Sequence, residues 1–525
     1  MNARRLAFWL LAFGAAGAAL WWAFHVPRTV RGPWNAVPAD ATWVTAHQRL
    51  AGRWDVLSEN RLLKSLAGAM GVETEDWEAL IVSPEIRRVI DWLGQDELIL
   101  AYVPSMPLTG RPAWVFAAWL GGRSQRLRWS LKSVDDPTLK PASARNGWRV
   151  WVWTPKGLKG GERITFSIVE GMVVGCIAAD AIGIEDVLAC VDGLAPSLAD
   201  TAAPRTPPDE GIPDWGWVRI GNGQDGGSFI RFAMDFRPNG GFRGKVAVPG
   251  GWPAAVATDS SDLKELAALL GERPTAVLVA GRPLAAAWLA KASNNLLGRE
   301  FAALFGSSST GAAGFALLGG PFSGRYRAVR LPTLVGGFST ETPDSVVADV
   351  QAALDRINAA TPWGLVLHPI SVGTQRVYAI ESTGRSAYAA AEMNERLAFA
   401  VLGRSVVFSS NAGALLALLR ESRSAADHDV DQTSLSAALG RMHKRNAGAY
   451  LGFDLTEGAK MARLAITAWS LKLLIENPTG SLPFRERLNA AKGWIDAIAP
   501  QRKLEVWALP GPGRIEYEFA LGDEL

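Results

Sequence analysis

Two distant stretches of this sequence follow one pattern, and this repetition constrains the fold more than any other feature. Residues 164–193 hold an apolar segment, a polar turn, a second apolar segment and a helical pattern, and residues 397–423 hold the same series. The matching core positions, 233 residues apart, are Phe166 and Phe399, Val173 and Val406, and Val174 and Val407. Each stretch therefore predicts a strand, a turn, a strand and a helix, with these residues in the core.

A second pair of landmarks extends the repeat. Leu50 aligns with Leu284 and Trp54 with Trp288, both 234 positions apart. Two separated segments with nearly the same offset indicate a tandem duplication. The expected ranges are 38–250 for the first copy with a proline-rich loop at 196–213, 251–272 for a linker with a short helix, and 273–525 for the second copy with a helical insertion at about 457–498.

The order of the patterns predicts the fold class. A chain of 525 residues exceeds the size of a single hydrophobic core, so two or more domains are expected. Apolar segments joined by tight turns, with helical patterns grouped between them, favour an α+β class in which each copy is a mainly antiparallel sheet covered by helices. The strict alternation of strand and helix that would indicate a parallel sheet is absent.

The N-terminal residues 1–24 resemble a signal anchor. Two arginines precede an uncharged run from Leu6 to Phe24, which would be about 28 Å long as a helix and so close to the thickness of a bilayer core. A cleaved signal peptide is the alternative, but Trp21 and Trp22 are typical of an interfacial anchor. We therefore expect a transmembrane helix, a tether at residues 25–37, and a periplasmic body on a single-pass inner-membrane protein.

Charge and cysteine content narrow the function classes. The formal charge is only +3, with 54 basic and 51 acidic side chains, and no long basic block occurs, so a nucleic-acid partner is not expected. The only two cysteines are Cys176 and Cys190. They can form a disulfide in an oxidising compartment or remain as two buried thiols, and the sequence leaves both possibilities open.

The motifs that usually identify enzymes are missing or are better explained as structure. Gly221, Gly223 and Gly226 have dinucleotide-binding spacing, but an extended segment follows them where a helix is required, which favours a turn. The pair Ser261 and Lys264 has the spacing of a serine nucleophile and its lysine base, yet it opens a polar helix. We therefore assign no catalytic residue and no cofactor.

Histidine spacing gives no metal site. The five histidines do not occur at the spacing of a helical metal motif. His428 lies among acidic residues in the segment 427–431, which could form a weak cation loop, but the sequence favours a solvated acidic loop that leads to a helix at Leu435. We expect no metal.

Tryptophan supplies the one candidate binding feature. Of 22 tryptophans, Trp148, Trp151 and Trp153 lie close together in the first copy, and the last two alternate onto one face of a strand. They can stack on sugars or lie at a lipid headgroup boundary, because tryptophan combines an apolar body with a polar N–H. The competing explanation, which the sequence favours, is that they fill the core between sheet and helix.

The duplicated units, the PADAT segment that begins at Pro38 and the N-terminal anchor together resemble uncharacterised bacterial membrane-anchored envelope proteins with duplicated domains of unknown function. This resemblance implies a location and a domain plan. It supplies no catalytic residue.

The leading functional hypothesis is a non-enzymatic, membrane-tethered scaffold or partner-binding protein of the bacterial envelope. The first alternative is a glycan- or lipid-binding module that uses Trp148, Trp151 and Trp153. The second is an enzyme whose polar groups converge at the junction of the two copies. We expect the partners to be the membrane, through the N-terminal helix, and an envelope protein, glycan or lipid.

Overall fold

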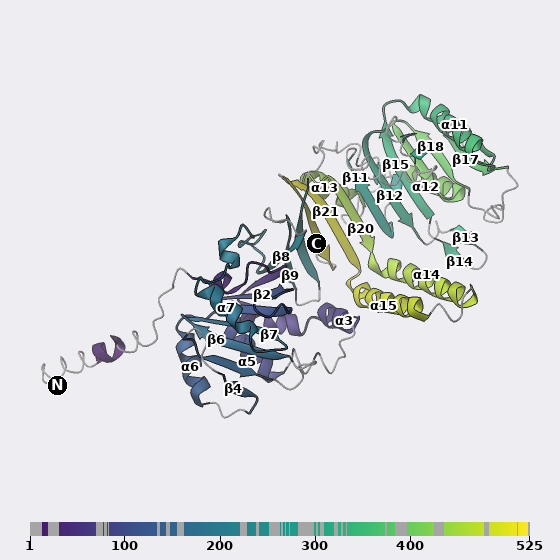
Figure 1. Ribbon diagram of the computed structural model, residues 1–525. Coiled ribbons are helices and arrows are strands. Elements are labelled where there is room, and N and C mark those ends of the chain that lie inside the picture. Colours follow the sequence, from purple (N-terminus) through teal and green to yellow (C-terminus); the bar gives the residue numbers. More distant parts are fainter. Residues whose placement is uncertain are drawn as a thin grey trace, which may run out of the picture. The chain divides into compact units, whose positions relative to one another are not determined.

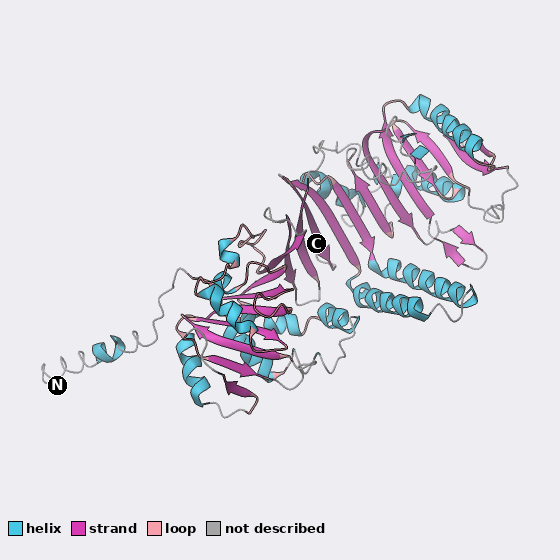
Figure 2. Cartoon of the chain, in the orientation of Figure 1, coloured by secondary structure: helices cyan, strands magenta, loops and turns pink. Residues whose placement is uncertain are grey.

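The structure is a computed structural model (Figures 1 and 2). It describes residues 13–18, 31–69, 77, 81, 83–133, 137–142, 147–154, 162–209, 211–220, 228–237, 241–250, 263, 266–267, 269–271, 274–281, 299–300, 303–304, 309–319, 324–326, 329–331, 333–372, 375–383, 396–424, 435–476, 482–511 and 513–522. The chain divides into two compact units. Unit 1 comprises residues 1–239 and 244–248, and unit 2 comprises residues 240–243 and 249–525.

Unit 1 is built mainly from antiparallel strands. Its strands are β1 (Trp43–Gln48), β2 (Glu97–Val103), β3 (Ala113–Trp119), β4 (Leu139–Pro141), β5 (Val150–Trp153), β6 (Arg163–Val169), β7 (Met172–Ala178), β8 (Asp214–Ile220), β9 (Ser228–Phe236) and β10 (Phe242–Pro249), which crosses the division between the units. Its helices are η1 (Pro33–Ala36), η2 (Leu50–Arg53), α2 (Trp54–Ser58), α3 (Arg61–Ala69), α5 (Pro84–Leu93), α6 (Arg123–Ser133), α7 (Gly183–Val191) and η5 (Leu198–Asp200).

Unit 2 uses the same kinds of element. Its strands are β11 (Ala276–Ala280), β12 (Ser309–Leu318), β13 (Gly324–Tyr326), β14 (Val329–Leu331), β15 (Thr333–Thr340), β16 (Leu365–Val372), β17 (Gln375–Ser382), β18 (Ala398–Leu402), β19 (Ser405–Ser409), β20 (Ala449–Asp454), β21 (Lys503–Gly511) and β22 (Arg514–Leu521). Its helices are α11 (Pro343–Ala360), α12 (Ala412–Ser424), α13 (Leu435–Lys444), α14 (Leu455–Glu476), α15 (Leu482–Ile498) and η9 (Ala499–Gln501).

The two units repeat one order of strand pairing. In unit 1 the order is β10-β9-β8-β1-β2-β3-β7-β6-β5-β4. In unit 2 the order is β22-β21-β20-β11-β12-β15-β19-β18-β17-β16. Every strand in one sheet therefore has a matching strand in the other, and side chains at matching paired positions can be compared directly.

Helices pack on both faces of the unit 1 sheet. One face carries Val44, Ile99, Val115 and Val174, and it packs against the apolar side of α7. We call the opposite face the Trp43 face, because on it Trp43 is followed by Thr45 and His47 along β1. Helices α5 and α6 cover only part of the Trp43 face, through a cluster that includes Leu131 and residues of β3, β5, β6 and β7. The remaining part carries exposed side chains, which are described below.

One cross-strand pair of a phenylalanine and a glycine occurs at the same position in both sheets. Phe116 on β3 pairs with Gly175 on β7, and a Cβ atom added to this glycine would lie 2.4 Å from the phenylalanine ring. At the matching pair of unit 2, Gly336 on β15 pairs with Phe408 on β19, and an added Cβ would lie 2.0 Å from that ring. Each pair holds one ring over one glycine, with the two residues exchanged between strands.

The predicted α+β class is wrong. Twenty of the strands are assigned to antiparallel sheet, with β13 and β14 forming a separate hairpin. The prediction gave the helical patterns too much weight. Each antiparallel strand leaves N–H and C=O groups that need a neighbour, and short segments such as β4 extend the sheet beyond the strands expected from the sequence.

The predicted signal anchor is also wrong. Within the part of the chain that the structure describes, no helix combines the length and apolar character needed to cross a bilayer. Of residues 1–24, only 13–18 are described, and they form one short helical segment. The transmembrane helix and the single-pass inner-membrane location that followed from it are therefore withdrawn.

The hydrophobic positions of the repeated stretch lie in the core. Five of these six side chains are buried: Val173, Val174, Phe399, Val406 and Val407. Phe166 is half-buried and packs against the cluster that includes Leu131 of α6. The proline-rich loop 196–213 has fixed structure in its described residues. Leu198 in η5 is fully buried, and the loop carbonyl of Pro204 accepts a hydrogen bond from Trp217 Nε1.

Candidate functional site

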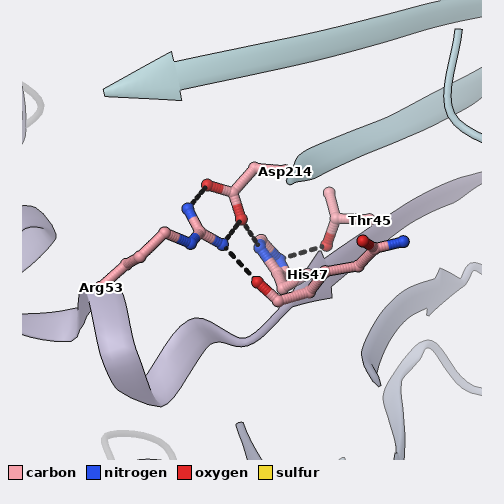
Figure 3. Close-up of polar contacts among 5 residues, drawn as sticks. Thr45, His47, Arg53 and Asp214 are labelled. Carbon is pink, nitrogen blue, oxygen red and sulfur yellow. Dashed lines mark hydrogen bonds and ion pairs between the residues drawn. The ribbon is translucent and has the colours of Figure 1, made fainter. Parts of the chain in front are cut away.

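A polar cluster lies where the end of β1 meets the start of β8 (Figure 3). His47 and Asp214 are direct cross-strand partners, and His47 Nδ1 lies 2.8 Å from Asp214 Oδ1. Arg53 binds both carboxylate oxygens of Asp214, with Nη2 donating to Oδ1 at 2.8 Å and Nη1 donating to Oδ2. On the other side of the imidazole, His47 Nε2 lies 3.1 Å from Thr45 Oγ1. The order is therefore carboxylate, imidazole, hydroxyl.

The turn after β1 brings Arg53 back to this strand. Arg49 adopts a left-handed backbone conformation with φ of 51°, which is unfavourable for a residue with a Cβ, and the chain then enters the 3₁₀ turn η2. From the end of that turn, Arg53 Nη2 donates to the carbonyl oxygen of Gln48 at 2.8 Å. The guanidinium is thus held by both the main chain and the carboxylate, which fixes its position.

Asp214 is ionised in this arrangement. Its side chain is only 6% exposed, and this burial alone would raise its pKa. Hydrogen bonds and charge from Arg53 and His47 outweigh the burial and hold the pKa of Asp214 below its usual value. The carboxylate is therefore a fixed negative charge with defined partners.

The partners of His47 determine its tautomer. An ionised carboxylate can only accept hydrogen bonds, so Nδ1 of His47 must donate to Asp214. In the neutral ring Nε2 then has a free lone pair and accepts the hydroxyl proton of Thr45. This is the arrangement of orienting acid, base and hydroxyl that activates a nucleophile in acyl-transfer enzymes.

A row of apolar side chains crosses the Trp43 face beside this cluster. Seven directly paired residues form the row, one from each strand from β8 to β5: Val218, Trp43, Tyr102, Trp114, Ile177, Ile164 and Trp153. None is buried: Trp43 is 41%, Val218 39% and Trp114 37% exposed, and the other four are half-buried. We call these seven residues the aromatic row.

The rings of the row pack edge to face. Trp43 and Trp114 have ring centroids 5.3 Å apart at an interplanar angle of 69°, and Tyr102 and Trp114 are 5.2 Å apart at 55°. Tilted aromatic pairs of this kind are mutually attractive, so the rings hold one another in place. The result is a ridged apolar surface with no flat stack of parallel ring faces.

Unit 2 has no counterpart of the polar cluster, and its matching row is apolar but largely aliphatic. At the positions of His47 and Asp214 it holds Ala280 and Ala449, which are buried in a cluster that includes residues of α11. The position of Thr45 is taken by Leu278. The positions of the first four residues of the aromatic row are occupied by Phe453, Ala276, Leu317 and Leu334. The fold therefore forms without the polar cluster and with one aromatic residue in place of three.

The three tryptophans singled out from the sequence do not form one surface. Trp151 is buried in the cluster that packs against α6. Trp148 packs against the core on the opposite face, and its Nε1 donates to Asp192 Oδ1 at 3.2 Å. Trp153 alone is part of the aromatic row. The expected stacking face is therefore divided, and the exposed tryptophans Trp43 and Trp114 lie on other strands.

Sequence reasoning missed the polar cluster because its members are far apart along the chain. His47 and Asp214 are separated by 167 positions. Thr45 and His47 do alternate onto one strand face with Trp43, but many strands show such alternation. The usable signal was the comparison of copies, since His47 aligns with Ala280 at the offset of the repeat.

The two cysteines are free, buried thiols. Burial, with the nearby acidic charges of Asp180 and Asp186, raises the pKa of Cys176 to about 12. Burial likewise raises the pKa of Cys190 to about 12. Neither thiol is therefore a reactive nucleophile at neutral pH.

Several motifs weighed from the sequence lie outside the described residues. These are the glycines 221–226, Ser261, Lys264 and the acidic loop 427–431. Among the residues that are described, no group of three or more His, Cys, Asp or Glu side chains is placed to hold a metal ion.

Comparison with known proteins gives no relative from which a role could be transferred. No protein-family model matches the chain, and searches of curated proteins and of solved structures likewise find no match.

Proposed function

We propose that this chain is a binding protein that takes a protein partner on the aromatic row of unit 1. The observation that carries the proposal is the row itself, in which seven paired strands each place an apolar side chain on the Trp43 face, three of them exposed and four half-buried. A contiguous exposed apolar surface on a folded unit is typical of an interaction site.

The residue types favour a protein partner. Tryptophan and tyrosine are enriched among the residues that dominate protein–protein binding energy, because they bury a large area at little entropic cost. Exposed Trp43 and Trp114 would be the central anchors. A sugar ring, in contrast, stacks best on an open ring face, and here Trp43 and Trp114 pack edge to face, so the edge of one ring covers a face of the other. The geometry therefore favours interdigitating side chains over a flat glycan.

Site-specific crosslinking would test this proposal. A photoreactive phenylalanine analogue placed at Trp114 should give covalent adducts with a protein in the native cells, whereas the same analogue at Leu334 should not. Leu334 is the matched control, since it holds the same sheet position in unit 2 and is also exposed.

Affinity for the crosslinked protein, once purified, supplies the second measurement. The double substitution Trp43→Ala, Trp114→Ala should weaken binding about 30-fold or more, equivalent to about 2 kcal/mol for a central anchor pair. The substitution Leu334→Ala should leave the affinity unchanged. Equal crosslinking from both units, or an unchanged affinity of the double variant, would contradict the proposal.

A further inference from the structure

The polar cluster provides more than a binding surface requires. A binding face needs apolar area and a few satisfied polar groups, yet here a fixed carboxylate, an imidazole with a defined tautomer and a hydroxyl follow one another at 2.8 and 3.1 Å. Such a series lowers the cost of removing the hydroxyl proton when the oxygen attacks an electrophile. Thr45 Oγ1 is therefore the atom in this cluster best placed to react.

The cluster is not a requirement of the fold. Unit 2 builds the same strand pairing with Leu278, Ala280 and Ala449 at the three positions. Apolar residues at such sites are often at least as stabilising as a buried ion pair, so the polar set in unit 1 is costly to retain for stability alone. Because unit 2 folds with apolar residues at these three positions, the fold alone does not account for the polar residues of unit 1, which favours a reactive role for them.

The surroundings of Thr45 indicate the substrate class. Thr45 is half-buried and follows Trp43 by two residues on the same strand face, so the two side chains are about 7 Å apart. An apolar chain lying on Trp43 and Val218 would place a carbonyl group attached to it near Oγ1. The class of molecule that satisfies both conditions is an ester of an apolar carboxylic acid.

We propose that Thr45 is the nucleophile of an acyl-transfer site specific for such esters. Thr45 Oγ1 forms a bond to the carbonyl carbon while its proton passes to Nε2 of His47, and the bond from that carbon to the leaving oxygen then breaks. His47 returns the proton to the leaving oxygen, which departs as an alcohol. Water next attacks the acyl-threonine and gives its proton to His47, which passes it to Oγ1 as the carboxylic acid leaves.

The other two charged residues position the base. Asp214 holds His47 in the tautomer that leaves Nε2 free to accept. Arg53 fixes the carboxylate through both oxygens and is itself held by the Gln48 carbonyl. Both residues are therefore positioning residues, and Thr45 and His47 are the pair that contacts the reacting atoms.

The test uses the full chain with p-nitrophenyl butyrate and with an alkyl fluorophosphonate that labels activated hydroxyls. Wild type should hydrolyse the ester, and Thr45→Val should lower the rate about 100-fold or more, as expected for loss of an activated nucleophile. Thr42→Val is the matched control, because it removes a half-buried threonine hydroxyl three residues away and should leave the rate unchanged.

Labelling of the folded wild-type chain makes the test independent of how well the variants fold. Peptide mass mapping should find the fluorophosphonate on Thr45, and His47→Gln should abolish that label. An unmodified Thr45 in wild type, or a Thr45→Val variant that hydrolyses the ester at the wild-type rate, would overturn the inference. The inference goes beyond the proposed partner binding, and the two fail separately, since Thr45→Val should leave crosslinking from position 114 unchanged.

Discussion

The Trp43 face of unit 1 and the matching face of unit 2 have the same strand register but differ in the side chains they carry. Where unit 1 pairs His47 with Asp214, unit 2 pairs Ala280 with Ala449. Where unit 1 exposes Trp43 and Trp114, unit 2 has Ala276 and Leu334. The comparison teaches that the same strand pairing forms with aliphatic residues at these positions. The charged cluster and the exposed tryptophans of unit 1 are therefore additions to the fold, and they are the places to look for function.

Polar residues also occur in unit 2, around a buried carboxylate. Glu505 is fully buried, accepts hydrogen bonds from Arg441 and Tyr450, and forms an ion pair with Lys503. Burial and the neighbouring Glu505 charge raise the pKa of Tyr450, so its hydroxyl stays protonated. The central carboxylate of this network is closed off from solvent, whereas Thr45 and His47 in unit 1 are half-buried.

The largest effect is expected from the exchanged ring and glycine. Phe116→Gly should destabilise unit 1 by about 4 kcal/mol, because it leaves a cavity where the ring covers Gly175. The double substitution Phe116→Gly, Gly175→Phe reproduces the arrangement of unit 2 and should recover most of that loss. Urea unfolding that is monitored by thiol labelling of Cys176 and Cys190 measures the stability of unit 1 alone, since unit 2 contains no cysteine. A double variant no more stable than Phe116→Gly would show that the pairs are not equivalent.

A somewhat smaller loss is expected when the polar cluster is broken. Asp214→Ala should destabilise unit 1 by about 3 kcal/mol, because it leaves Arg53 partly buried without its anion. The triple substitution His47→Ala, Arg53→Leu, Asp214→Ala removes all the charges, places alanine at the two paired positions as in unit 2, and should cost less than the single one. The same thiol-monitored urea unfolding measures both variants. If the triple variant is the less stable, the polar cluster is a structural requirement of unit 1 after all.

The smallest effect concerns the thiols in the folded chain. With the pKa of Cys176 and Cys190 raised to about 12, the reactive thiolate is scarce at pH 8, and both should be labelled only as fast as unit 1 opens. Ser409→Cys places a thiol at the position of Cys176 in unit 2, where the side chain is also buried. It should be equally protected, at a cost of about 1 kcal/mol for the lost hydroxyl hydrogen bonds. Rapid labelling at 409 alone would show that the two cores differ in their dynamics.

Local sequence patterns predicted individual elements well, and distant contacts poorly. The apolar pattern of residues 164–178 corresponds to the hairpin of β6 and β7, because alternation and a glycine turn are local signals. The fold class failed because the number of paired strands depends on which segments meet, and short strands such as β4 carry little signal of their own. The candidate site failed for a related reason, since Asp214 reaches His47 only after β8 has paired with β1.

The tryptophan prediction shows the limit of a one-strand argument. Trp151 and Trp153 lie on the same face of β5, as expected. However, Trp151 is buried in the cluster that packs against α6, whereas Trp153 is only half-buried. Which end of a strand a helix covers is decided by the connections between strands, and the sequence of β5 alone does not contain that information.

The exchange of Phe116 and Gly175 for Gly336 and Phe408 sets a rule for recombining the two halves of this gene product. A chimera that transferred β3 without β7 would bring two rings together in one sheet and two glycines together in the other, so one hybrid would be overfilled and its reciprocal would be hollow. The smallest segment that can be exchanged between the units is therefore the strand pair, β3 with β7 or β15 with β19. Its two paired positions must be exchanged together.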